Sequence, residues 1–127
     1  MHKLFLSWGA ALAGLGVVLG AFGAHKLKEI APESVNTFQT GVQYQMYHAF
    51  ALILAAIVFE KVSSKYIVWS GYSFLIGILL FSGSLYALSL LKATGEVGLG
   101  RVGVITPIGG LFFIAGWLLF LLAVLKK

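Results

Sequence analysis

Four long apolar segments without a single charged residue constrain the fold of this chain more than any other feature. A helix needs about 20 mostly apolar residues to cross the 30 Å hydrocarbon core of a bilayer. Open strands would leave unpaired backbone groups in lipid, whereas a helix satisfies its own. The sequence therefore predicts an all-α bundle of four transmembrane helices, a single membrane domain (1–127) with spans at about 4–24, 38–59, 66–91 and 102–125.

The composition agrees with a membrane protein and argues against a soluble one. Hydrophobic residues make up 60% of the chain and charged residues 10%, whereas a soluble domain carries about 25% charged residues. The net charge of +5 comes from basic residues scattered at the ends of the apolar segments. Because they form no basic stripe, we expect membrane lipids, and no nucleic acid, as partners.

The first apolar segment also invites a reading as a signal peptide, because Lys3 precedes it. Its apolar stretch is about 21 residues long, whereas the hydrophobic part of a signal peptide spans roughly 7–15. We therefore expect this segment to be retained as a membrane span.

The basic residues also predict the orientation. An even number of spans places both termini on one side of the membrane, and cytoplasmic segments carry an excess of Lys and Arg. The terminal side has five such residues (Lys3, Lys61, Lys65, Lys126, Lys127) and the opposite side four (Lys26, Lys28, Lys92, Arg101). This narrow excess favours both termini in the cytoplasm.

Small residues recur on one face of the first span. Gly9, Ala13, Gly16 and Gly20 follow one another at intervals of four, three and four residues. Such spacing lets two helices in lipid approach closely. The partner is either another helix of the same chain or a second subunit in a homo-oligomer. In the fourth span, the pair Gly109–Gly110 predicts a second close-packing site.

The start of the second span is unusually polar. It combines three glutamines, two tyrosines and a histidine without any charge (Gln39, Gln43, Tyr44, Gln45, Tyr47, His48). On a helical wheel these residues and Thr40 cover about two-thirds of the circumference. The remaining strip, which includes Phe38, Val42 and Met46, is the one expected to suit lipid. Pro32 and Glu33 are suited to an earlier helix start.

Three interpretations of this polar half-helix remain open. It lines a pocket for a ligand or lipid headgroup on the non-cytoplasmic side, together with His25; or His25 and His48 hold a metal or haem; or the polar groups hydrogen-bond the helices into register. The metal interpretation is the weakest. The two histidines would differ in depth by about 15 Å, and no acid or cysteine accompanies them. We therefore expect no metal and no cofactor.

Catalysis and ion-coupled transport also find little support. All four acidic residues (Glu29, Glu33, Glu60, Glu96) lie in the predicted connections, whereas proton-driven transporters rely on an acid inside the membrane. Ser82 and Ser84 have no evident base beside them. Ser82, Tyr86 and Ser89 form a weakly polar stripe suited to hydrogen bonds between helices. We expect no catalytic residues.

Four sequence blocks, one per span, carry a family resemblance. GAFGAH (20–25), FQTGVQYQMYHA (38–49), LLFSGSLYALSL (79–90) and ITPIGGLFFIAGW (105–117) resemble the YgdD/YwdK-type family of small membrane proteins. The resemblance implies a four-helix protein of the bacterial inner membrane. That family has no established biochemical role, so it transfers no catalytic residues. The leading hypothesis is a structural or accessory membrane protein; the alternative is a module that binds or transports a lipid or small solute beside the second helix.

Overall fold

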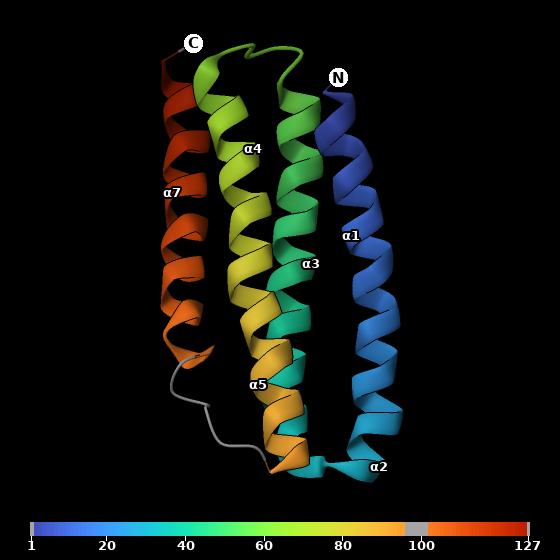
Figure 1. The fold of residues 1–127 in the computed structure, drawn as a ribbon. Coiled ribbons are helices and arrows are strands. Elements are labelled where there is room, and N and C mark those ends of the chain that lie inside the picture. The colour runs from blue at the N-terminus through green and yellow to red at the C-terminus, as the bar shows by residue number, and fades with distance from the viewer. Residues whose placement is uncertain (1, 96–101, 127) are drawn as a thin grey trace.

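The computed structural model describes residues 2–95 and 102–126, and these form an up-and-down bundle of long helices (Figure 1). Within them, four helices are long and apolar enough to cross a membrane. Both termini lie at the same end of the bundle (Figure 1). The all-α fold of four spans predicted from the sequence is therefore confirmed.

The first two spans are joined with almost no loop. Helix α1 (Lys3–Phe22) continues through a π-helical turn (Gly23–Leu27) into the short α2 (Lys28–Ile30). A 3-10 turn (Pro32–Ser34) then leads directly into α3 (Val35–Val58). The connection expected over 25–37 is thus largely helical, and only Ala31 leaves the helical conformation, with φ −153° and ψ 68°. The charged residues of this connection do not end the helical conformation, because a helix can continue beyond the hydrocarbon core into the headgroup region.

The third span bends where α4 (Lys65–Gly77) passes through a π-helical segment (Ile78–Ser82) into α5 (Gly83–Thr94). Gly95 caps α5 in the left-handed conformation with φ 72°, which glycine adopts without steric cost. The fourth span is α7 (Ile105–Leu125). Glu96 and Arg101, named in the predicted connection, lie outside the described residues, as does Lys127.

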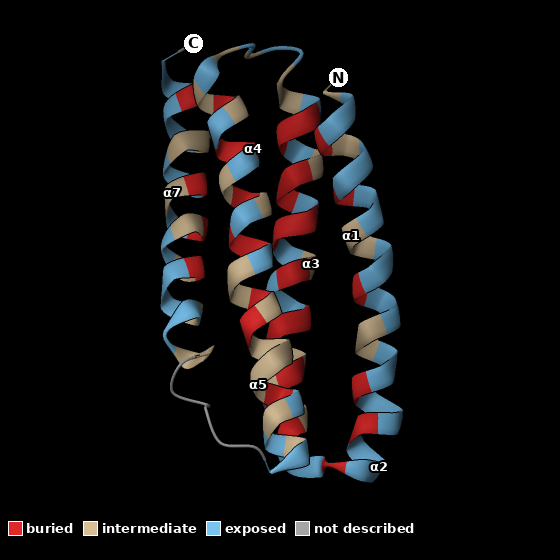
Figure 2. Ribbon diagram, viewed as in Figure 1, coloured by how far each residue is buried: buried red, intermediate tan, exposed pale blue. Residues whose placement is uncertain are grey.

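Helix α3 is the centre of the bundle (Figure 2). Half of its most apolar 18-residue window is buried, against 17% for α1 and 22% for α7. It packs on α1 along one side and on α4 and α5 along another, while α7 packs mainly on α4. The most polar span is therefore the one best shielded from lipid, as the cost of exposing amides to hydrocarbon requires.

The small-residue face of α1 packs against α3 of the same chain. A Cβ at Gly9 would lie 3.0 Å from the Ala49 carbonyl oxygen, one at Gly16 would collide with the Met46 sulfur, and one at Gly20 would lie 3.4 Å from Val42. Ala13 is half-buried on the same helix. The predicted close approach is present, and its partner is a helix of the same chain.

The second close-packing site lies between α7 and the third span. A Cβ at Gly109 would collide with the backbone of Phe81, whereas Gly110 leaves 3.8 Å to the Phe81 ring. Further along the two helices, Phe113 lies against Gly77 and Phe74 against Gly116. Gly77 and Gly116 each accommodate an aromatic ring of the facing helix, and Gly109 accommodates the Phe81 backbone, so the two helices pack closely at several levels.

One expectation about α3 is wrong. The apolar strip that was expected to face lipid is buried: Phe38 is 3% exposed and Val42 8%, and Met46 is half-buried. This strip meets the glycines of α1. A helical wheel separates polar from apolar faces, but it does not reveal which face a neighbouring helix covers.

Candidate functional site

His48 is the centre of the largest polar and aromatic cluster, at the junction of α3, α4 and α7. Its Nδ1 lies 2.7 Å from the Tyr44 carbonyl oxygen, and the Trp117 indole N–H donates to its Nε2 over 3.0 Å. A carbonyl can only accept and an indole N–H can only donate. The two bonds therefore fit only a neutral ring with its proton on Nδ1.

Aromatic rings enclose His48 from several sides. The imidazole stacks on Phe113 with ring centroids 3.6 Å apart and an interplanar angle of 8°. Phe74 lies 5.6 Å from His48 and 4.9 Å from Trp117. Both ring nitrogens are already bonded and one ring face is stacked, so His48 is a structural hydrogen-bonding residue here.

Gln45 ties α3 to two other helices. Its side chain is 2% exposed, and its amide nitrogen donates to the Leu12 carbonyl oxygen of α1 over 2.8 Å. Its amide oxygen accepts from the Tyr86 hydroxyl of α5 at 2.5 Å. Gln39 repeats the first contact nearer the membrane surface, donating to the Gly20 carbonyl oxygen over 3.1 Å.

Serine hydroxyls add a third set of interhelical bonds. Ser82 donates to the Gly41 carbonyl oxygen over 2.7 Å, and Ser89 donates to that of Ser34 over 3.0 Å. Together with Tyr86, they realise the polar stripe predicted on the third span. Ser70 of α4 likewise donates to the Gly116 carbonyl oxygen of α7 over 2.7 Å. Each bond fixes one helix against the backbone of another.

The sequence-predicted binding residues divide into two groups. Gln39, Gln45 and His48 point inward and are hydrogen-bonded, as described above. Gln43, Tyr44 and Tyr47 are exposed, Tyr44 to 37% and Tyr47 to 56%. His25 is exposed in the π-helical turn (Gly23–Leu27) that joins α1 to α2. The structure therefore does not gather these seven residues into one pocket.

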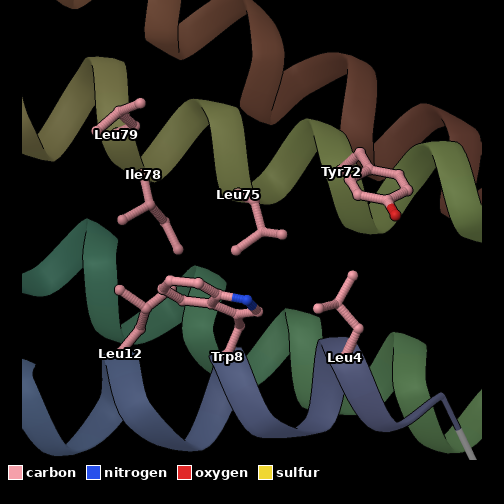
Figure 3. A pocket seen from close by; sticks show the side chains of 7 residues that line it. All are labelled: Leu4, Trp8, Leu12, Tyr72, Leu75, Ile78 and Leu79. Atoms are coloured by element: carbon pink, nitrogen blue, oxygen red, sulfur yellow. The ribbon is translucent and has the colours of Figure 1, made fainter.

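A groove does exist, but it lies elsewhere and has a different chemistry. It has a volume of about 400 Å³, between the N-terminal half of α1 and the third span (Figure 3). Its lining is almost entirely apolar: Leu4, Trp8, Leu12, Tyr72, Leu75, Ile78 and Leu79. We call it the α1–α4 groove. Sequence reasoning missed it because apolar residues facing a groove look the same as apolar residues facing lipid.

Besides the groove, the sequence did not predict the contact of Trp117 with His48. Trp117 lies 69 positions from its partner His48, and nothing local to either residue signals the pairing. An indole N–H in a membrane-spanning helix needs an acceptor because lipid offers none, which makes an intramembrane histidine a candidate partner. Among residues 2–95 and 102–126, no group of three or more His, Cys, Asp or Glu side chains is placed to hold a metal ion.

Comparison with known proteins places the chain in a family. A family model described as "Protein of unknown function (DUF423)" matches residues 19–110. Over 98% of each chain, it is 41% identical to the UPF0382 membrane protein YwdK of Bacillus subtilis. It is 38% identical to a UPF0382 membrane protein of Staphylococcus haemolyticus, over 98% of this chain and 97% of that protein. The UPF0382 inner membrane protein YgdD of Escherichia coli K12 is 37% identical, with 99% of this chain and 93% of that protein covered.

No solved structure matches the chain. The family model covers most of the sequence, and the relatives align along almost its full length and share its membrane character. The predicted resemblance is thereby confirmed, and the chain belongs to the UPF0382 (DUF423) family of membrane proteins.

Proposed function

We propose that the protein is a structural or accessory component of the bacterial inner membrane, with both termini in the cytoplasm, and that it is not an enzyme. One observation supports this role most directly. The buried polar side chains of α3 and the third span are engaged in bonds between helices, with His48 and Gln45 at the centre. Groups committed in this way hold a shape and are not free to act on a reactant.

The structural role is tested by removing the hydrogen bonds of Gln45 and His48 and measuring thermal unfolding and solute permeability. Gln45→Met keeps the length of the Gln45 side chain, His48→Phe keeps an aromatic ring at position 48, and both remove the interhelical bonds. We expect both variants to unfold at lower temperature, because each leaves partner groups unsatisfied. Wild-type proteoliposomes should be no more permeable to small solutes than protein-free liposomes. A wild-type solute flux that either variant abolishes at unchanged stability would replace this proposal with a transport function.

The α1–α4 groove supports a second candidate function, the binding of a lipid acyl chain. Its volume lies within the range of about 300–1,000 Å³ common for ligand sites, and its apolar lining matches a hydrocarbon chain. Tyr72 and Trp8 supply the aromatic part of that lining. The candidate site is thus apolar and lies outside the polar cluster that the sequence pointed to.

Lipid binding in the groove is tested by filling it. Leu75→Trp adds an indole to the groove, whereas Ile114→Trp adds one to an outer face of α7 that is 58% exposed. Native mass spectrometry from lipid nanodiscs should show retained lipid for the wild type and for Ile114→Trp, and less for Leu75→Trp. Equal lipid retention in all three would count against a specific groove site.

A homo-oligomer through small residues was one of the two possibilities for α1. In the structure, the small-residue face of α1 packs on α3 of the same chain, where Gly9 lies against Ala49 and Gly16 against Met46. Any self-association of the accessory protein therefore has to use another surface.

A further inference from the structure

The central helix α3 keeps one face turned outward along its whole length. The face consists of Asn36, Thr40, Gln43, Tyr47, Phe50, Leu54 and Ile57, which we call the α3 stripe. All are exposed except the half-buried Thr40. Tyr47 is 56% exposed, Phe50 52%, Leu54 50% and Ile57 47%. The helix that is otherwise most enclosed thus has a continuous open surface.

The spacing of the α3 stripe is that of a coiled-coil seam. Its members follow one another at intervals of four, three, four, three, four and three residues, the a and d positions of a heptad repeat. From Asn36 to Ile57 the seam is about 32 Å long at 1.5 Å per residue. Its length thus matches the thickness of the hydrocarbon core, about 30 Å.

Four members of the stripe are polar, and two of them, Gln43 and Tyr47, lie in its interior, away from the Asn36 end. Gln43 is about 10 Å and Tyr47 about 16 Å along the helix from Asn36. Neither the Gln43 amide nor the Tyr47 hydroxyl has a hydrogen-bond partner among residues 2–95 and 102–126. An amide facing hydrocarbon without a partner costs several kcal/mol, and tyrosine in membranes prefers the interface. Lipid is therefore a poor covering for this face.

We propose that the α3 stripe is the interface with a second copy of this chain. A two-fold axis along the membrane normal brings identical residues together at the same depth. An amide both donates and accepts, so Gln43 is complementary to Gln43 of the second copy. The stripe carries no charge that would repel its own image. This inference rests on the proposed accessory role, and it identifies a second copy of the chain as the protein's partner in that role.

The position of Gln43 in the heptad strengthens the choice of a second copy over another occupant. With Asn36, Phe50 and Ile57 it occupies one of the two seam positions. Asn36 lies at the end of the seam, so Gln43 is the polar residue inside the seam at this position, and a polar residue there fixes register and partner number in coiled coils. Thr40, Tyr47 and Leu54 occupy the other. A headgroup could satisfy Gln43 only at the membrane surface, whereas a facing copy satisfies it at its own depth.

Single cysteines test the interface directly, because the chain has none of its own. We expect Tyr47→Cys and Leu54→Cys in native membranes to form a disulfide-linked species at twice the 13.6 kDa mass upon mild oxidation. The controls Leu79→Cys and Val17→Cys, on surfaces 72% and 64% exposed, should stay at the single mass. Equal cross-linking at all four positions, or none along the stripe, would overturn the proposal.

A second measurement removes the polar contact alone. Gln43→Leu should weaken the dimerisation constant in detergent about threefold to tenfold, as loss of one interhelical hydrogen bond does in membranes. Leu121→Ala, on an outward face of α7, should leave it unchanged. Association that Gln43→Leu leaves unchanged or strengthens would contradict the interface. If the interface fails while Gln45→Met and His48→Phe still lower the unfolding temperature, the accessory role stands; if those variants leave it unchanged, the role itself fails.

Discussion

Replacing Gly109 by alanine would place a methyl group where α7 crosses closest to the third span. The new Cβ would collide with the Phe81 backbone nitrogen and lie 2.7 Å from the Phe81 Cα. A flexible side chain could rotate away, but backbone held in a helix cannot, so the two helices would have to separate. That separation would loosen the neighbouring contacts between Phe113 and Gly77.

The expected loss follows from two opposing terms. Overpacking a core typically costs about 1–3 kcal/mol, and a clash with backbone belongs at the upper end. Alanine regains about 1 kcal/mol over glycine in helix propensity. We therefore expect Gly109→Ala to lower the free energy of unfolding by about 2 kcal/mol.

Gly14→Ala provides the matched control, because a Cβ at Gly14 meets no atom within 4 Å. It should be neutral or stabilising by up to about 1 kcal/mol. Unfolding of both variants in mixed micelles, titrated with sodium dodecyl sulfate and followed by circular dichroism, measures the difference. If Gly109→Ala proves as stable as Gly14→Ala, close backbone approach at this crossing is refuted.

Three further substitutions test the polar contacts by the same unfolding titration. Gln45→Leu removes two interhelical bonds and should lower the free energy of unfolding by about 1–4 kcal/mol, since in lipid each such bond contributes about 0.6–2 kcal/mol. A loss below about 0.5 kcal/mol, the range of a surface substitution, would contradict the arrangement. His48→Phe keeps the stack on Phe113 but leaves the Trp117 N–H without its acceptor, so we expect a loss of about 1–3 kcal/mol and a shift in indole fluorescence, and an unmoved emission maximum would argue against the contact. Lys92→Gln removes an exposed hydrogen bond to Thr37 and should change the free energy of unfolding by at most about 0.5 kcal/mol. A larger loss would contradict the solvent exposure of this bond.

Much of the fold could be read from local sequence because lipid imposes simple rules. Runs of about 20 uncharged apolar residues have few alternatives to a spanning helix, and small residues at four-residue spacing permit close helix contact. The early helix start suggested by Pro32 also appears, as a 3-10 turn leading into α3. These rules do not say which helix each face contacts. For that reason the sequence alone assigned the apolar strip at Val42 to lipid, whereas in the structure it contacts α1.

The sequence by itself determined that the chain is a four-span membrane protein and that its second span is the polar one. Only the tertiary structure decided what the polar residues do. It turned Gln45 and His48 inward, onto Leu12, Tyr86 and Trp117, and left Gln43 and Tyr47 outward. The physical reason is that helix periodicity fixes the angle of a side chain around its own axis, whereas the partner at that angle comes from a helix distant in the sequence. Two glutamines two positions apart on α3 thus have opposite surroundings, one bonded within the chain and the other on the outer surface of the bundle.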